Sequence, residues 1–122
     1  CLSVDGDTEQ SMARARLAPC GGTPNQMWAT PVVDKGVLLR AFSGGVCLDN
    51  WGARGRVGDA VGTYTCVPGA PTQTWTLTSA GELKLSNGLC VAPASAPAAG
   101  VPVTLATCDG SAAQRWTVSG PA

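Results

Sequence analysis

Six cysteines and the absence of histidine limit the chemistry that this chain can perform. Its 122 residues include six Cys, no His, and eight acidic against eight basic side chains. Without imidazole, the chain lacks the commonest general base and every catalytic triad built on it. The cysteines form no C-x-x-C pair, so they favour disulfides over zinc or redox chemistry and indicate an oxidising compartment. We expect an extracellular protein that is not an enzyme and uses no cofactor.

The charged residues suggest no other active centre. Nothing in the spacing of the Asp and Glu residues indicates the carboxylate pair of a glycosidase. Residues 5–9, DGDTE, resemble half of a calcium loop but lack its glycine and its distal Glu, so we expect no metal. Arg54 and Arg56 are interpreted as parts of a solvated loop. The chain has no basic patch for nucleic acid, and no apolar run approaches the roughly 20 residues of a membrane helix.

The cysteines belong to a threefold internal repeat, which is the strongest signal in the sequence. Two of the cysteine pairs enclose 18 residues and the third encloses 17, and five or six residues after each pair comes Gln-x-Trp. The repeated positions are Cys1, Cys20, Gln26 and Trp28; Cys47, Cys66, Gln73 and Trp75; and Cys90, Cys108, Gln114 and Trp116. Six cysteines allow 15 pairings, of which pairing within each copy treats the copies alike and closes the shortest loops. We therefore predict Cys1–Cys20, Cys47–Cys66 and Cys90–Cys108.

Short strands must position these residues. Residues 36–42 (GVLLRAF) and 81–86 (GELKLS) follow glycine turns and are typical of strands. Further short strands are predicted at both cysteines of each copy and at each Gln-x-Trp, which leaves no room for a helix. The sequence predicts one all-β domain over 1–122, with copies at about 1–35, 36–80 and 81–122. The biased stretch 92–100 is interpreted as a surface loop of the third copy.

This pattern resembles the ricin B-type lectin domain, a β-trefoil carbohydrate-binding module of three four-stranded repeats. The resemblance implies six strands closing a barrel, three hairpins capping it, the same within-copy disulfides, and a core built around Trp28, Trp75 and Trp116. Copies 2 and 3 have a strand ahead of the first cysteine, whereas the sequence begins at Cys1 in copy 1. We therefore expect eleven of the twelve strands here, with the vacant edge filled by upstream chain or another domain.

The resemblance also implies one potential sugar site per copy. Its parts are an Asp two residues after the first Cys, an aromatic two residues before the second Cys, and an Asn before the Gln. Copy 1 has Ser3, Ala18 and Asn25 at these positions, copy 3 has Ala92, Ala106 and Ala113, and copy 2 has Asp49, Tyr64 and Thr72. A pyranose presents one C–H face and several hydroxyls, so it suits a ring beneath it and a fixed carboxylate beside it. Copy 2 is therefore the predicted site.

Neighbouring residues complete the candidate set and carry alternatives. Asn50 and Trp51 directly follow the carboxylate, and Trp51 is either a second stacking platform or a loop-packing residue. Asp49 could instead cap a turn, and Tyr64 could merely cover a hairpin. The three repeated glutamines are expected to bond backbone inside the fold, with Gln73 also able to reach a ligand.

The sequence therefore predicts a secreted, non-catalytic carbohydrate-binding module, an appendage of an enzyme such as a glycoside hydrolase. Its ligand would be a glycan or polysaccharide with galactose, xylose or arabinose units, and neither nucleic acid nor membrane is an expected partner. The alternative is a trefoil with decayed sugar sites that serves protein–protein or interdomain contact. The two copies without carboxylate or ring favour this alternative, whereas Asp49 with Tyr64 favours sugar binding.

Overall fold

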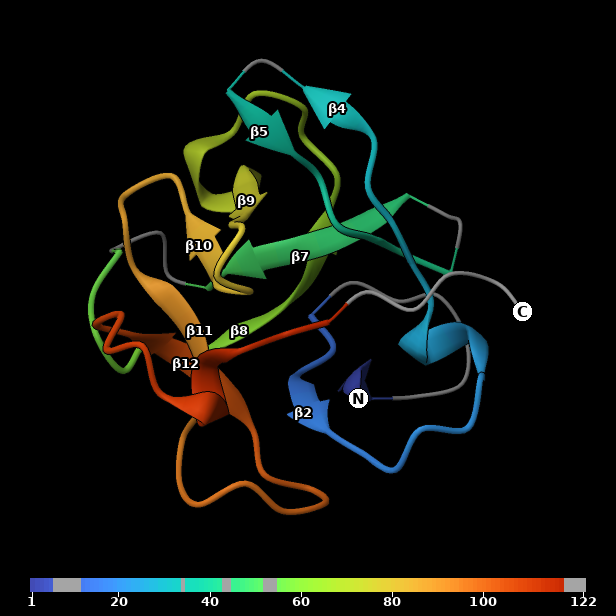
Figure 1. Ribbon diagram of the computed structural model, residues 1–122. Coiled ribbons are helices and arrows are strands. Elements are labelled where there is room, and N and C mark those ends of the chain that lie inside the picture. The colour runs from blue at the N-terminus through green and yellow to red at the C-terminus, as the bar shows by residue number, and fades with distance from the viewer. Residues whose placement is uncertain (6–11, 34, 43–44, 52–54, 118–122) are drawn as a thin grey trace.

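The computed structural model describes residues 1–5, 12–33, 35–42, 45–51 and 55–117. Within these residues the chain forms short strands and three single-turn 3-10 helices, without an α-helix (Figure 1). The strands are β1 (Leu2–Val4), β2 (Ala15–Leu17), β3 (Trp28–Ala29), β4 (Val32–Val33), β5 (Gly36–Val37), β6 (Arg40–Ala41), β7 (Val46–Asn50), β8 (Val61–Thr65), β9 (Trp75–Leu77), β10 (Leu83–Leu85), β11 (Cys90–Pro93) and β12 (Val103–Ala106). The 3-10 helices are η1 (Pro24–Gln26), η2 (Pro71–Gln73) and η3 (Ala112–Gln114). None of the described helices is long or apolar enough to cross a membrane.

Three antiparallel hairpins, β1–β2, β7–β8 and β11–β12, carry the paired cysteines. The disulfides are those predicted from the repeat, Cys1–Cys20, Cys47–Cys66 and Cys90–Cys108, with Cα–Cα distances of 5.0 to 5.2 Å. The hairpins share one register, because the first cysteine lies opposite the residue two positions before the second one. Cys47 pairs with Tyr64, and Cys90 pairs with Ala106. Equivalent positions of the three repeats therefore lie at equivalent places on their hairpins.

The remaining strands connect the hairpins. β3 and β4 pair with β6 and β5, and β9 pairs with β10, so the end of each of the first two repeats lies against the start of the next. Three isolated bridges, Arg14↔Gly62, Arg16↔Pro102 and Ala60↔Thr104, link each of the three hairpins to the other two. The predicted all-β, threefold organisation is confirmed.

The core lies between the hairpins and the connecting strands. Its members are apolar residues that alternate along the strands, as expected for sheets with one buried face. They include Val4, Ala15, Leu48, Val61, Trp75, Leu85, Val91, Val103 and Leu105, and Trp75 is fully buried. Trp28 and Trp116 are partly buried and pack against the same cluster.

Local structure differs from the sequence predictions in three places. The strand expected over 36–42 is divided into β5 and β6, with the buried residues Leu38 and Leu39 between them. Each Gln-x-Trp begins in a 3-10 helix and not in a strand; η1 and η2 start with a proline, whose fixed φ suits the first helical position. The last strand expected after Trp116 is not assigned within the described residues 115–117, and residues 118–122 lie outside them.

Candidate functional site

One hydrogen-bonded unit, which we call the Gln-x-Trp lock, recurs in all three repeats. The glutamine Oε1 accepts the N–H of the residue after the second cysteine, and its Nε2 donates to the carbonyl of the residue before that cysteine. The pairs are Gly21 and Pro19 for Gln26, Val67 and Thr65 for Gln73, and Asp109 and Thr107 for Gln114, at 2.7 to 2.9 Å. The lock therefore fixes the backbone on both sides of the second cysteine of each pair.

The tryptophan of each lock ties the same segment to the start of its hairpin. The indole N–H donates to the carbonyl of the residue after the first cysteine, at 3.0 to 3.2 Å. These pairs are Trp28 with Leu2, Trp75 with Leu48, and Trp116 with Val91. The same bonds to the backbone occur in every repeat. Differences in ligand chemistry between the repeats therefore depend on the side chains around the lock.

In the second repeat the lock also holds a carboxylate. Asp49 lies on β7 with 8% of its surface exposed, and its Oδ2 accepts a 2.8 Å hydrogen bond from Gln73 Nε2. Burial raises the pKa of the Asp49 carboxyl above its ordinary value, and side-chain hydrogen bonds from Gln73 and Thr72 partly offset that effect. A carboxylate has about four lone-pair sites, so these two bonds fix it and still leave it able to accept from a ligand.

Two aromatic rings lie on the same hairpin face as Asp49. Cys47 pairs with Tyr64 and Asp49 with Gly62, so the side chains of Asp49 and Tyr64 project from one face of β7–β8. Tyr64 is 47% exposed, which leaves much of its side chain accessible to a ligand.

Trp51 continues this face beyond the end of β7. Its N–H donates to Ala60 O at 3.0 Å, which extends the ladder, and its indole N–H donates to Thr63 O at 3.2 Å. The indole covers Gly62 so closely that a Cβ added there would collide with the ring and with Ala13 O. Trp51 thus packs against the hairpin and remains partly exposed.

Asn50 is turned to the other side of β7 and is 1% exposed. Its Oδ1 accepts the N–H of Gly55 at 2.9 Å, and its Nδ2 donates to Asp59 Oδ2 at 3.1 Å and to Trp51 O at 3.3 Å. The structure therefore places Asp49, Tyr64, Trp51, Thr72 and Gln73 near one another. Asn50 instead bonds Gly55 and Asp59 in the segment between β7 and β8.

The equivalent positions of the other repeats have different contents. In repeat 1, Ser3 is buried and its Oγ accepts a 3.1 Å hydrogen bond from Asn25 Nδ2, so the two polar groups satisfy each other. The ring position there is Ala18. In repeat 3, all three positions are alanine, at 92, 106 and 113.

Two other acidic residues among those that the structure describes, Glu82 and Asp5, have structural surroundings. Glu82 lies near Cys90 and Cys108, but both sulfurs belong to a disulfide and offer no thiolate. Asp5 forms a 3.0 Å ion pair with Arg16. The rest of the DGDTE stretch and Arg54 lie outside the described residues.

Comparison with known proteins gives one matching family model and several structures of similar fold. A family model described as the ricin-type beta-trefoil lectin domain matches residues 35–121. The designed threefold symmetric protein ThreeFoil superposes with a TM-score of 0.81 at 25% identity, over 93% of this chain and 85% of the designed one. No curated protein sequence matches the chain.

Two plant proteins share the fold. An agglutinin from Abrus precatorius superposes with a TM-score of 0.79 at 24% identity, over 96% of this chain and 43% of the agglutinin. A non-toxic homologue of type II RIPs from Momordica charantia (bitter gourd), in complex with α-methyl-D-galactoside, gives 0.77 at 24% identity, over 96% of this chain and 42% of that one. This chain thus spans less than half the length of either plant protein.

Proposed function

This chain belongs to the ricin-type β-trefoil lectin domain family, and we propose that it is a non-catalytic carbohydrate-binding module with its main sugar site in the second repeat. The observation that carries the proposal is the Asp49 carboxylate, fixed by Gln73 and Thr72 on the same hairpin face as the exposed ring of Tyr64. Neither feature is present at the equivalent positions of repeats 1 and 3.

The chemistry of this face suits a pyranose. Tyr64 offers a surface on which the C–H face of the sugar can stack, while Asp49 accepts from its hydroxyls through charge-assisted hydrogen bonds. Trp51, which packs on Gly62 of the same hairpin face, adds a second aromatic surface. One such shallow site is expected to bind at about the millimolar level, or about 4 kcal/mol.

We further propose that the module is secreted and holds an enzyme, such as a glycoside hydrolase, on a polysaccharide or glycan. Its three disulfides suit an oxidising compartment. Weak binding to one sugar unit still gives useful retention when a polymer offers many units and the module is tethered to the enzyme.

A second function, contact with another protein or domain, is favoured by one observation. Two of the three equivalent positions lack both carboxylate and ring, so a family member could lose sugar binding and keep its fold. This alternative and the sugar site make opposite predictions for the experiment below.

The test is calorimetric titration with methyl galactosides, xylose and arabinose and with oligosaccharides of each. Asp49→Ala should abolish detectable binding because it removes the fixed acceptor, and Tyr64→Ala should weaken binding about tenfold or more by removing the stacking face. Ser3→Ala, at the equivalent position of repeat 1, is the matched control and should leave the affinity unchanged.

Each variant is first checked for folding by circular dichroism. Undiminished binding in both Asp49→Ala and Tyr64→Ala would exclude the second-repeat site. If the wild-type chain binds none of these sugars, contact with a protein or domain becomes the better explanation.

A further inference from the structure

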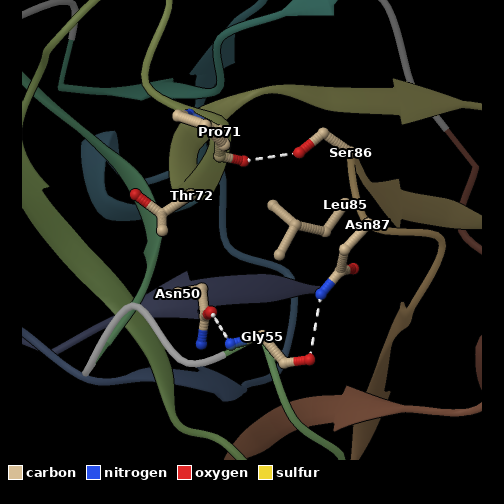
Figure 2. Close-up of a pocket in the computed structure, with 7 residues that line it drawn as sticks. All are labelled: Asn50, Gly55, Pro71, Thr72, Leu85, Ser86 and Asn87. Atoms are coloured by element: carbon tan, nitrogen blue, oxygen red, sulfur yellow. Dashed lines mark hydrogen bonds between the residues drawn. The ribbon is translucent and has the colours of Figure 1, made fainter.

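A hollow lies beside Thr72, the residue that also hydrogen-bonds Asp49. It has a cavity volume of about 210 Å³ and lies between the end of β7, η2 and the turn after β10 (Figure 2). Its lining residues are Asn50, Gly55, Pro71, Thr72, Leu85, Ser86 and Asn87. We call this hollow the η2 pocket. The sequence repeat gave no indication of it, because its walls come from two different repeats.

Thr72 separates the η2 pocket from the carboxylate. Its hydroxyl hydrogen-bonds the Asp49 side chain, and the same residue lines the pocket. In Figure 2 the Thr72 hydroxyl points away from Leu85 and Asn87, which form the opposite wall. A ligand that extends past Thr72 from Asp49 would therefore enter the pocket next.

Hydrogen bonds connect the segments that form the rim of the η2 pocket. Ser86 Oγ donates to Pro71 O at 2.8 Å and joins the turn after β10 to η2. Asn87 Nδ2 donates to Gly55 O at 3.0 Å, and Asn50 Oδ1 accepts from Gly55 N on the other side of the same residue (Figure 2). A site organised in this way before binding loses little entropy when a ligand enters.

The lining chemistry selects a neutral, amphipathic ligand. None of the seven lining residues is charged. The buried Leu85 and the ring of Pro71 supply an apolar surface, whereas Ser86 and Asn87 are exposed polar groups at the rim. Among the described residues, the Asn87 amide uses one of its two hydrogens, for Gly55 O, and the Ser86 oxygen retains its acceptor capacity. An uncharged sugar unit has a matching apolar face and hydroxyl edge.

We propose that the η2 pocket is a second subsite, which holds the sugar unit adjacent to the one bound at Asp49. The inference rests on the proposed function and makes it more specific: the ligand is a neutral oligosaccharide segment of at least two units, and not a single terminal sugar. Chains whose adjacent unit is a uronic acid or a sulfated sugar are disfavoured, because the pocket offers no cation to such a group.

The experiment compares chain lengths. Methyl galactoside, galactobiose and galactotriose, and in parallel xylose, xylobiose and xylotriose, are titrated against the wild-type chain. We expect the disaccharide of the bound series to bind at least tenfold more tightly than its monosaccharide. Ser86→Tyr, which fills the pocket from an exposed position, should remove this gain and leave monosaccharide affinity within about twofold. Ser95→Tyr makes the same change in the exposed loop between β11 and β12 and should behave as wild type.

A second variant avoids reliance on one bulky substitution. Asn87→Ala removes the rim amide and should reduce the disaccharide gain about threefold or more, again without change for the monosaccharide. In NMR spectra of the wild-type chain, the Asn87 side-chain amide should shift on addition of disaccharide but not of monosaccharide.

The possible outcomes separate the two proposals. Equal affinity of wild type for mono- and disaccharide, or a gain that survives Ser86→Tyr, overturns the second subsite and leaves the Asp49 site intact. Loss of monosaccharide binding in a folded Ser86→Tyr chain also overturns it, because the pocket would then not be separate from the first site. Binding of no sugar at all overturns the proposed function together with this inference.

Discussion

Repeats 2 and 3 have the same framework and different surfaces. Both have a disulfide, a lock made by Gln73 or Gln114, and an indole bonded to the hairpin, and both pair the first cysteine with the residue two before the second. Yet repeat 2 presents Asp49 and Tyr64 where repeat 3 presents Ala92 and Ala106. The repeated residues maintain the fold, while the residues that vary between repeats give repeat 2 alone the carboxylate and the ring of the proposed sugar site.

Gln73 is a repeated residue of the framework that also contacts the proposed site. Like Gln114 it bonds backbone on either side of a cysteine, but its Nε2 also donates to Asp49 Oδ2. The proposed site in repeat 2 therefore uses a structural residue as its support. Repeat 1 shows a third arrangement, in which Asn25 Nδ2 donates to Ser3 Oγ and the two polar groups bond each other.

Removing an indole tests whether the framework is equally important in the three repeats. Trp75→Ala should cost about 3 to 5 kcal/mol of unfolding free energy, because the side chain is fully buried in the core. Trp28→Ala and Trp116→Ala should cost less, since both side chains are only partly buried. Urea denaturation of the three variants measures this order, and equal costs would show that burial does not distinguish the repeats.

Removing a glutamine separates the two roles of the lock. Gln73→Ala and Gln114→Ala should each lower the unfolding free energy by about 1 to 3 kcal/mol, because each leaves a backbone N–H and a backbone carbonyl without their partner. Gln73→Ala alone should also weaken sugar binding, since Asp49 loses the donor that orients it. Thermal melts and sugar titrations of both variants provide the test. Equal loss of binding in the two would contradict the assignment of the site to repeat 2.

Neutralising Asp49 tests whether its buried charge lowers the free energy of unfolding at neutral pH. Burial raises the pKa of the Asp49 carboxyl in the folded chain, so its contribution to stability is greatest at low pH and is lost as the pH rises through that folded-state value. Asp49→Asn should therefore melt a few degrees above wild type at neutral pH, and the difference should shrink in acid. Sugar binding should be strongly weakened by the same change.

Two observations check this prediction. Melting curves of wild type and Asp49→Asn across the acid range give the sign of the pH effect. In wild type, sugar binding should decline in acid at a higher pH than an ordinary Asp would produce, as the carboxylate becomes protonated. An Asp49→Asn chain that is less stable than wild type at neutral pH would mean that the bonds from Gln73 and Thr72 outweigh the cost of burying the charge.

Transferring the variable residues to repeat 3 gives the smallest expected effect. Ala92→Asp with Ala106→Tyr places a carboxylate and a ring in the register that Asp49 and Tyr64 have in repeat 2. Gln114 occupies the position of Gln73 and can support the new carboxylate. We expect a second site of millimolar or weaker affinity, seen as a rise in binding stoichiometry. Ala106→Tyr alone should not produce it.

The sequence predicted the framework because its residues recur. The cysteine spacing and Gln-x-Trp identified three repeats, and both the disulfides and the all-β fold are confirmed. The 3-10 helices before each tryptophan were missed, since three residues are too few to establish a helical period. Pro24 and Pro71 were the only local signal for them.

The surroundings of the site depend on contacts between distant segments. The residue order alone does not indicate that the Trp51 ring lies against Gly62. Nor does it indicate that Asp49 bonds Gln73 whereas the neighbouring Asn50 bonds Asp59. The η2 pocket joins Thr72 of one repeat to Leu85 of the next, so neither repeat alone predicts it. The assignment of Asp49, Tyr64 and Trp51 to a sugar site stays a prediction for the titrations to decide.

The pattern of covalent links has a consequence for proteolysis. Each disulfide closes the two ends of a single hairpin, with sequence separations of 18 or 19 residues. A protease that cuts the exposed loop between β11 and β12 therefore leaves both halves joined through Cys90–Cys108. A cut in the turn between β9 and β10 is different, because no disulfide spans it and only non-covalent contacts would hold the two pieces together. In a protease-rich environment, the hairpins would tolerate nicks and the joints between repeats would be the vulnerable points.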